Sequence, residues 1–400
     1  MRTQIQSPLA ETAAGAVAES VLRACVHCGM CNAACPTYQL TGDELDGPRG
    51  RIYLMKQALE GEAAGGLTRH HLDRCLGCRA CETACPSGVE YHRLLDVGRA
   101  VGTGRRPWNQ RLARWAIRRL TLSPNLLSGL FALGRAVRFA LPRAVREAIP
   151  PNVPAGPWPR PANTRRMLLL GGCVQSAAAR RFNAATARVF DHCGVSLTES
   201  GGCCGAVSFH LDAHDEARAL ARGHIDAWSA ALANGAEAVV VNASGCAAFI
   251  RDWPDLLSED PAYAAKARAI VARLRDPVEI LADLTLAPRR APAHRKIAVH
   301  DPCTLANGPG LAGAPARLLE SLGYEPVPVA GEPLCCGSAG AYSLLQPGFA
   351  RRLRTQKLAA LTAGAPETIY TGNIGCWMHL GAVADVPVRH WIEAVDDLIS

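Results

Sequence analysis

The fold of the N-terminal region is decided by two stretches, CVHCGMCNAACP at residues 25–36 and CLGCRACETACP at residues 75–86. Both have the pattern C-x2-C-x2-C-x3-C-P. Three thiolates at two-residue gaps let a short backbone loop wrap three corners of a cubane iron–sulfur cluster, while the fourth cysteine, followed by proline, points elsewhere. Structural zinc sites usually show two separate C-x2-C pairs instead. The pattern therefore predicts iron–sulfur clusters and makes zinc the weaker alternative.

The fourth cysteine of each run predicts how two clusters share their ligands. In two-cluster ferredoxins this cysteine ligates the other cluster. Carried over to this chain, one 4Fe-4S cluster would be bound by Cys25, Cys28, Cys31 and Cys85. The other would be bound by Cys75, Cys78, Cys81 and Cys35. Crossed ligation of this kind holds two clusters close together.

The segment between the two runs predicts helix. Apolar residues recur at helical spacing from Ile52 to Leu59, after a turn at residues 46–48. Arg49 and Arg51 could balance the charge of a cluster held by four thiolates, or could be solvated residues at the start of a helix. His27, between two expected ligands, fits a surface loop.

Charge divides the chain into regions. The whole sequence has 43 Lys and Arg against 35 Asp and Glu, a net charge of +8. Residues 101–166 alone carry 13 basic side chains and one acidic side chain, and this stretch ends in proline-rich sequence at residues 149–161. The pattern predicts an N-terminal domain at residues 1–100 and a basic helical connector at residues 101–164, followed by a larger C-terminal region.

The 17 cysteines indicate the compartment. Because no secretory signal precedes them, we expect a reducing cytoplasm, where clustered thiols serve as metal ligands more often than as disulfides. The uncharged, largely apolar run at residues 120–134 contains Pro124 and is too short to span a bilayer.

The C-terminal region contains an internal repeat. MLLLGGC at residues 167–173 corresponds to KIAVHDPC at residues 296–303, CCG recurs at residues 203 and 335, and a strand-like run precedes a GC pair in both copies. The equivalent cysteines are Cys173, Cys203, Cys204 and Cys246 in the first copy and Cys303, Cys335, Cys336 and Cys376 in the second.

The repeat predicts two α/β domains, at residues 165–290 and 291–400. Short apolar runs alternate with helix-like segments, which favours parallel sheets, and cysteines just after strands would gather at the carboxyl edge of each sheet. We expect these eight cysteines to bind metal or to take part in redox chemistry, in preference to packing as inert core residues. Cys193 has no counterpart and fits a small buried apolar residue. The Gly-rich turns lack a dinucleotide or phosphate-loop fingerprint, so nucleotide binding is not expected.

Two long stretches carry a family resemblance. CVHCGMCNAACPTYQLTGDELDGPRGRIYLMKQ and DRCLGCRACETACPSGVEYHRLLDVGR, together with both CCG segments, closely resemble the iron–sulfur subunits of bacterial glycolate oxidase, also called glycolate dehydrogenase. The plan is similar to that of lactate utilisation, anaerobic glycerol-3-phosphate dehydrogenase and heterodisulfide reductase subunits. The resemblance implies an α-helical ferredoxin domain with two 4Fe-4S clusters and two CCG domains.

The same resemblance implies an electron-transfer subunit of an oxidoreductase. Flavin (FAD) partner subunits would oxidise glycolate, and the clusters would pass electrons to an acceptor such as quinone. The fuller CCG pattern ends in C-x2-C, whereas Ala243 and Asn373 stand at those positions here. This leaves open whether the CCG halves bind further clusters. A catalytic thiol–disulfide role in another CCG-family oxidoreductase, or a scaffold with folding metals, are the alternatives.

The basic connector indicates a contact surface. Arg111, Arg114 and Arg118 share one helical stripe, and further arginines follow at residues 135, 138, 143 and 146. Trp108, Leu112 and Trp115 form a second stripe. Residues 105–146 therefore suit a peripheral contact with the inner face of the cell membrane. An equally good interpretation is a set of helices that pack on this protein or on a partner subunit. No recognition motif supports nucleic acid.

Overall fold

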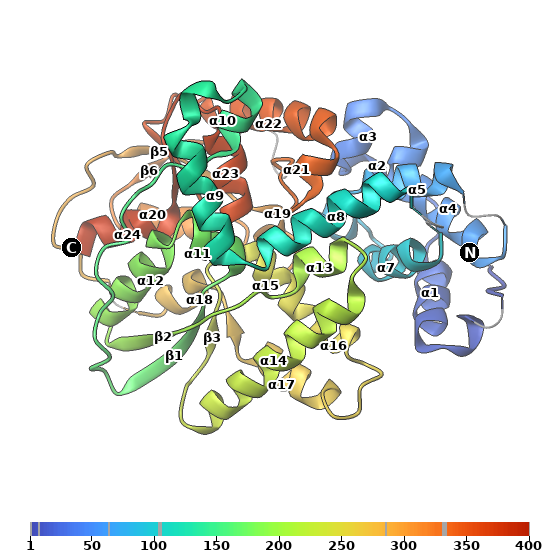
Figure 1. The fold of residues 1–400 in the computed structure, drawn as a ribbon, viewed down its shortest axis with the longest axis horizontal. Helices are drawn as coiled ribbons and strands as arrows, with labels where there is room; N and C mark the ends of the chain where they lie inside the picture. Colours follow the sequence, from blue (N-terminus) through green and yellow to red (C-terminus); the bar gives the residue numbers. More distant parts are fainter. Residues whose placement is uncertain are drawn as a thin grey trace. The chain divides into compact units, whose positions relative to one another are not determined.

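The computed structural model describes the chain except for residues 1, 7–8, 63–64, 103–105, 285, 330–333 and 400 (Figure 1). It divides into two compact units. The first comprises Met1–Ala113 and Pro333–Thr355, and the second comprises Arg114–Glu332 and Gln356–Ser400. The boundaries of the four domains proposed above stay predictions. The first unit includes a segment of the second CCG repeat together with the N-terminal region.

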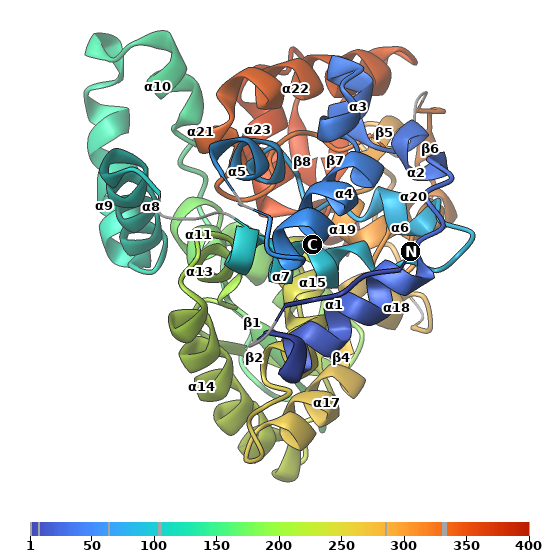
Figure 2. The same cartoon turned by 90° about the vertical axis from the view of Figure 1, so that its right-hand side faces the viewer.

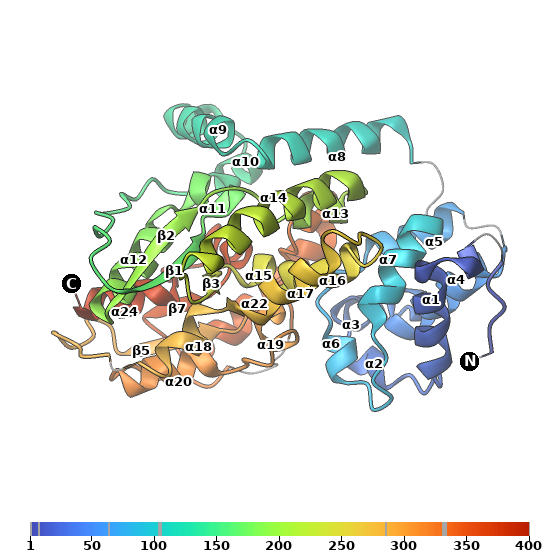
Figure 3. The ribbon, with the colours of Figure 1, turned by 90° about the horizontal axis from the view of Figure 1, so that it is seen from below.

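The first unit is built from helices, and its described residues contain no strand. The longer helices are α1 (Ala13–Ala24), α4 (Pro48–Leu59), α5 (Gly66–Asp73) and α7 (Tyr91–Gly102). The shorter elements are η1 (Leu9–Glu11), α2 (Met30–Ala33), α3 (Pro36–Thr41), η2 (Glu44–Asp46), α6 (Ala80–Thr83) and α21 (Tyr342–Leu345). Helix α7 packs against α1 and α4 (Figure 3). Leu22, Met55 and Leu94 lie fully buried between them, so the expected helix between the cysteine runs is confirmed.

The second unit contains two four-stranded parallel sheets of identical topology, β2-β1-β3-β4 and β6-β5-β7-β8. The first sheet has β1 (Arg165–Leu170), β2 (Val195–Ser200), β3 (Val239–Val240) and β4 (Leu274–Arg275). The second has β5 (Lys296–His300), β6 (Glu325–Pro326), β7 (Thr368–Thr371) and β8 (Val388–His390). The predicted parallel α/β duplication is confirmed. The central strands β1 and β3, and β5 and β7, are buried apart from the exposed first residues of β1 and β5, as expected for strands covered on both faces.

Helices cover both sheets. Those of the first half are α11 (Cys173–Ala178), α12 (Arg181–His192), α13 (Ala206–His210), α14 (His214–Ala233), α15 (Ser244–Arg251), α16 (Trp253–Leu256), α17 (Ala264–Ala272) and α18 (Pro277–Leu281). Those of the second half are α19 (Cys303–Ala306), α20 (Ala314–Ser321), α23 (Ile374–Gly381) and α24 (Trp391–Ile399). Helix α22 (Pro347–Thr362) begins in the first unit and continues into the second. Helix α14 packs against α17 on the first half (Figure 2).

The two halves share one hydrophobic core. Helix α12 of the first half packs against α24 of the second (Figure 1), and buried residues from both sheets belong to the same apolar cluster. Two ion pairs cross between these helices, Arg181 Nε to Glu393 Oε1 at 2.7 Å and Arg188 to Asp396 at 2.5 Å. The repeats therefore form one body, not two independent domains on a linker.

The connector is helical over α8 (Trp108–Thr121), α9 (Pro124–Ala136), η3 (Arg138–Ala140) and α10 (Arg143–Ala148). Within the part of the chain that the structure describes, no helix is long and apolar enough to cross a membrane.

Candidate metal centres

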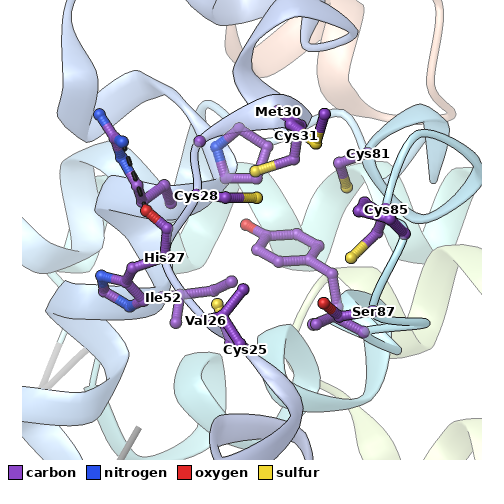
Figure 4. Close-up of a pocket in the computed structure, with 16 residues that line it drawn as sticks. Cys25, Val26, His27, Cys28, Met30, Cys31, Ile52, Cys81, Cys85 and Ser87 are labelled. Atoms are coloured by element: carbon purple, nitrogen blue, oxygen red, sulfur yellow. Dashed lines mark hydrogen bonds between the residues drawn. The ribbon is translucent and has the colours of Figure 1, made fainter.

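The first pocket lies among the thiols of Cys25, Cys28, Cys31 and Cys85 (Figure 4). It measures about 440 Å³ and is lined further by Cys81 and by apolar side chains that include Val26, Ile52 and Val89. Cys28 is exposed, so this pocket reaches the surface. Burial raises the pKa of Cys25 and, to about 11, that of Cys31. Burial thus favours the protonated thiols, and a bound metal ion is the kind of local charge that would stabilise them as thiolates.

The second pocket, about 400 Å³, is lined by Cys35, Cys75, Cys78 and Cys81. Cys85 from the second run thus joins the pocket of the first run, and Cys35 from the first run joins the pocket of the second. This is the grouping that crossed ligation predicts. The roles of the eight cysteines as ligands stay a prediction.

Both ligand loops have the same backbone shape. Each contains two residues in the left-handed region, His27 (φ 58°) and Gly29 (φ 83°) in the first and Gly77 (φ 64°) and Arg79 (φ 59°) in the second. A left-handed non-glycine residue costs about 1–2 kcal/mol. The fold accepts this cost because the turns wrap the backbone around the thiols. The contribution of His27 to the ligand loop is therefore its left-handed backbone conformation.

A buried charge network borders the second pocket. Arg51 is 1% exposed, and its Nε donates to the His71 carbonyl oxygen at 2.8 Å while Nη2 donates to Thr37 Oγ1 at 3.1 Å. Its Nη1 lies 3.9 Å from Cys35 Sγ. Burial would lower the pKa of Arg51, but the neighbouring thiols of Cys75 and Cys35 outweigh burial and raise it. Arg51 therefore remains a buried cation beside the thiols.

Asp46 completes this network and is fully buried. Its carboxylate accepts from His71 Nδ1 at 2.8 Å and from Arg74 Nη1 at 2.7 Å, and lies 3.7 Å from Arg51 Nη2. With one carboxylate between two guanidinium groups, the network holds excess positive charge beside the second pocket.

Arg49 has different surroundings. Its side chain is 37% exposed, pairs with Glu44 at 2.6 Å, and covers Gly29, where a Cβ would come within 2.5 Å of Nη1. Hydrogen bonding from Arg49 lowers the pKa of Glu44. Of the two arginines considered in the sequence, one is thus buried at a thiol and the other is a paired surface residue.

The segment after the second CCG motif contacts the first unit around Arg74 and Leu40. Tyr342 Oη donates to the Arg74 carbonyl oxygen at 3.1 Å, and the Arg74 guanidinium lies over the Phe349 ring, 4.9 Å from its centroid. Arg352 Nη2 donates to the Leu40 carbonyl oxygen at 2.7 Å. Sequence reasoning missed these contacts, since nothing local in the chain signals them.

The four cysteines of the first CCG half come together in the second unit. Cys173 begins α11 after β1, Cys203 and Cys204 follow β2, and Cys246 lies in α15 after β3, at the carboxyl edge of the sheet. Hydrogen bonds from the Cys173 and Cys204 thiols lower the pKa of Cys203, and a further thiol contact joins Cys204 to Cys246. His224 Nε2 donates to the Cys203 carbonyl oxygen at 3.2 Å.

The cysteines of the second CCG half lie in both units. Cys303 begins α19 after β5, and Cys376 lies in α23 after β7, with its Sγ 3.5 Å from Asn373 Nδ2. Cys335 and Cys336 are buried in the segment that belongs to the first unit. Cys193 caps α12 and packs against the shared core, and burial raises its pKa.

One residue beside this half was not singled out from the sequence. His300 ends β5 and is 1% exposed, and burial holds its pKa well below the usual range. The signal that was available is its place directly after an apolar strand, three residues before Cys303.

Family models match most of this architecture. A 4Fe-4S dicluster domain matches residues 21–89, and a cysteine-rich domain matches residues 167–251 and again residues 297–381. The fold and the thiol pockets thus define an iron–sulfur protein with one dicluster domain and two cysteine-rich domains.

Comparison with curated proteins narrows this class to one family. The chain is 46% identical, over the full length of both proteins, to the glycolate oxidase iron–sulfur subunit of Escherichia coli. It is 30% identical to the probable glycolate oxidase iron–sulfur subunit of Bacillus subtilis, covering 90% of this chain and 89% of the relative. Lactate utilization protein A of Shouchella clausii is 25% identical over 47% of this chain and 78% of its own. The chain belongs to the family of glycolate oxidase iron–sulfur subunits.

Proposed function

We propose that this chain is the electron-transfer subunit of a glycolate-oxidising complex. A flavin-containing partner subunit takes two electrons from glycolate, and this chain relays them singly toward an acceptor such as quinone. The observation that carries the proposal is the pair of four-cysteine pockets in one helical unit of a chain that matches glycolate oxidase iron–sulfur subunits over its whole length. Substrate chemistry belongs to the partners, because the cofactor that accepts a pair of electrons is the flavin.

Each N-terminal pocket holds one 4Fe-4S cluster, which when bound supplies one-electron transfer. The first is bound by Cys25, Cys28, Cys31 and Cys85. The second is bound by Cys35, Cys75, Cys78 and Cys81. The support is the pocket lining, in which the fourth cysteine of each run sits with the other run. The protein's own contribution is to fix the thiols and to place the buried Arg51 beside Cys35.

Metal content tests this proposal directly. Anaerobically purified full-length protein should contain about eight irons and matching sulfide if only these two clusters form, and more if the CCG halves are also filled. Reduction should produce EPR signals of two interacting clusters. Zinc without iron in anaerobic preparations would contradict the proposal.

A second candidate function rests on the first CCG half. The Cys203 thiol accepts hydrogen bonds from the Cys173 and Cys204 thiols and has a lowered pKa, the property of a reactive thiolate or of a metal ligand. If this half performs thiol–disulfide chemistry, Cys203→Ser should abolish turnover of the complex while the N-terminal EPR signals stay intact. Cys336→Ser makes the same test in the second half. Full activity in both variants would leave these cysteines a structural role.

The connector is proposed to hold the complex at the inner face of the cell membrane. Trp108 is 76% exposed and Phe139 is 86% exposed, and the helices around them expose further Leu and Val side chains. Four arginines of the segment, Arg106, Arg114, Arg118 and Arg143, are paired with carboxylates, so the attraction to anionic lipid falls to the remaining arginines. Arg105, at the start of the proposed segment, lies outside the described residues. Complex that stays wholly soluble in fractionation at low salt would contradict this proposal.

A further inference from the structure

The two CCG halves carry chemically different residues at one pair of positions, where two neighbouring strands end side by side. In the second half, His300 at the end of β5 pairs in register with Thr371 at the end of β7. The internal repeat places Leu170 and Val241 at the same two positions of the first half, and both are 1–2% exposed in its apolar core. One copy thus has an apolar pair where the other has an imidazole and a hydroxyl, in sheets of the same topology.

The geometry of His300 leaves one ring nitrogen available. Nδ1 lies 2.9 Å from Thr371 Oγ1, and Nε2 is buried without a hydrogen-bond partner among the residues that the structure describes. A buried polar atom that is left unpaired destabilises the folded protein, so the position of Nε2 calls for a partner. If Nδ1–H donates to the threonine, Nε2 presents its lone pair, which is how a hydrogen bond at one nitrogen prepares the other to bind a metal.

The surroundings of His300 supply soft ligands. A ring nitrogen of His300 and Sγ of Cys376 lie within 4.8 Å of each other, and both side chains are at least nine-tenths buried. Cys303 follows β5 by three residues at the same edge of the sheet. Imidazole together with thiolate is a donor set that suits iron, iron–sulfur clusters or zinc.

We propose that His300 is a metal ligand, which together with the neighbouring thiol of Cys376 binds an iron or iron–sulfur centre in the second CCG half. The inference rests on the proposed function, because that function supplies the reason for iron in this chain. The first half offers thiols alone, so the two repeats hold different centres. Replacement of thiolate by imidazole raises the potential of an iron–sulfur centre, which makes the second half the better electron acceptor of the two.

Histidine-specific isotope labelling tests the proposal without any substitution. Full-length protein is prepared anaerobically with natural or ¹⁵N-labelled histidine, its iron is counted, and electron spin-echo envelope modulation is recorded after reduction. A directly bound imidazole should produce a strong nitrogen coupling that changes with the histidine label. Iron clearly above about eight per chain without such a coupling would overturn the assignment of His300 and leave the other proposals standing.

Two variants identify the residue. The double variant His300→Leu, Thr371→Val copies the pair that the first half already packs in its core, and it should lose the coupling. His224→Gln alters another buried histidine, beside Cys203, whose Nε2 donates to a carbonyl oxygen; it should keep the coupling. A coupling that persists in the double variant would overturn the proposal. Wild-type iron of only about eight would also overturn it, and would show that the CCG halves hold no iron while the N-terminal relay stands.

Discussion

The two thiol pockets of the first unit have the same cysteine pattern and different electrostatic surroundings. The first pocket includes the exposed Cys28, with Val26 67% exposed beside it, and its nearest arginine, Arg49, is paired with Glu44 at the surface. The second is bordered by Arg51, which is 1% exposed. Residues 49 and 51 are two positions apart on one helix, or about 200° around its axis. Helical geometry therefore places Arg49 in a half-exposed ion pair over the first ligand loop and directs Arg51 into the buried surroundings of the second pocket.

This difference teaches that the cysteine motif determines the ligands, while helix α4 between the two cysteine runs determines the charges around each cluster. A buried cation stabilises the more negative, reduced state of a cluster more than a solvated, paired cation does, because the local dielectric constant is lower. We expect Arg51 to raise the reduction potential of the second cluster, and Arg49 to have little effect on the first.

The largest effect should come from the two crossed cysteines. Cys35→Ser should remove or convert the second cluster and spare the first, and Cys85→Ser should do the reverse. The measurement is iron content with EPR of both reduced variants. If Cys35→Ser abolished the cluster bound by its own run and Cys85→Ser did likewise, ligation would not be crossed and the comparison would have to be redrawn.

Arg51→Met should have the next largest effect. It leaves Asp46 buried with His71 and with only one of its two guanidinium neighbours, Arg74, and breaking a buried ion network typically costs about 3–5 kcal/mol. We expect a lower unfolding midpoint and a shift of one cluster signal to lower potential in an EPR redox titration. Arg51→Lys, which keeps the charge, should restore most of the potential. An unshifted potential in Arg51→Met would show that the charge of Arg51 does not distinguish the two clusters.

Arg49→Met is the matched control on the same helix. Its ion pair with Glu44 is about two-fifths exposed, and pairs of this kind contribute about 0–1 kcal/mol. We expect an almost unchanged unfolding midpoint and unchanged potentials of both clusters, measured as for Arg51. A shift in potential as large as that of Arg51→Met would mean that the burial of an arginine does not decide its effect on the cluster potentials.

The smallest effect should be the pH dependence of this surface pair. The pKa of Glu44 is lowered in the folded protein, chiefly by its hydrogen bond with Arg49. The stabilising contribution is therefore present above the unfolded pKa of about 4.3 and is lost as pH falls through the lower folded value. Wild type and Glu44→Gln should differ slightly in urea unfolding at pH 7 and converge under acid conditions. A difference that grew on acidification would contradict this sign.

Sequence reasoning reached the helical N-terminal unit, the family and the duplicated parallel sheets. These follow from local signals: cysteine spacing, apolar runs of strand length, and a repeat whose cysteines recur at nearly constant offsets. It raised Arg49 and Arg51 together but could not separate them, because the exposure of a charged side chain depends on what packs against its helix. It also passed over His300, whose significance comes from Thr371, a residue 71 positions away that only strand pairing brings alongside.

The chain's own pattern of residues determines which cysteines are available, in what spacing, and that they come in two ferredoxin-like runs and two CCG copies. Only the tertiary structure decides that Arg51 and not Arg49 is buried beside the thiols, that His300 lies against Thr371, and that the second CCG motif groups with the N-terminal unit. The physical reason is range. Ligand loops are shaped by backbone preferences over a few residues, whereas the charge, burial and partners around each thiol depend on contacts between segments far apart in the sequence.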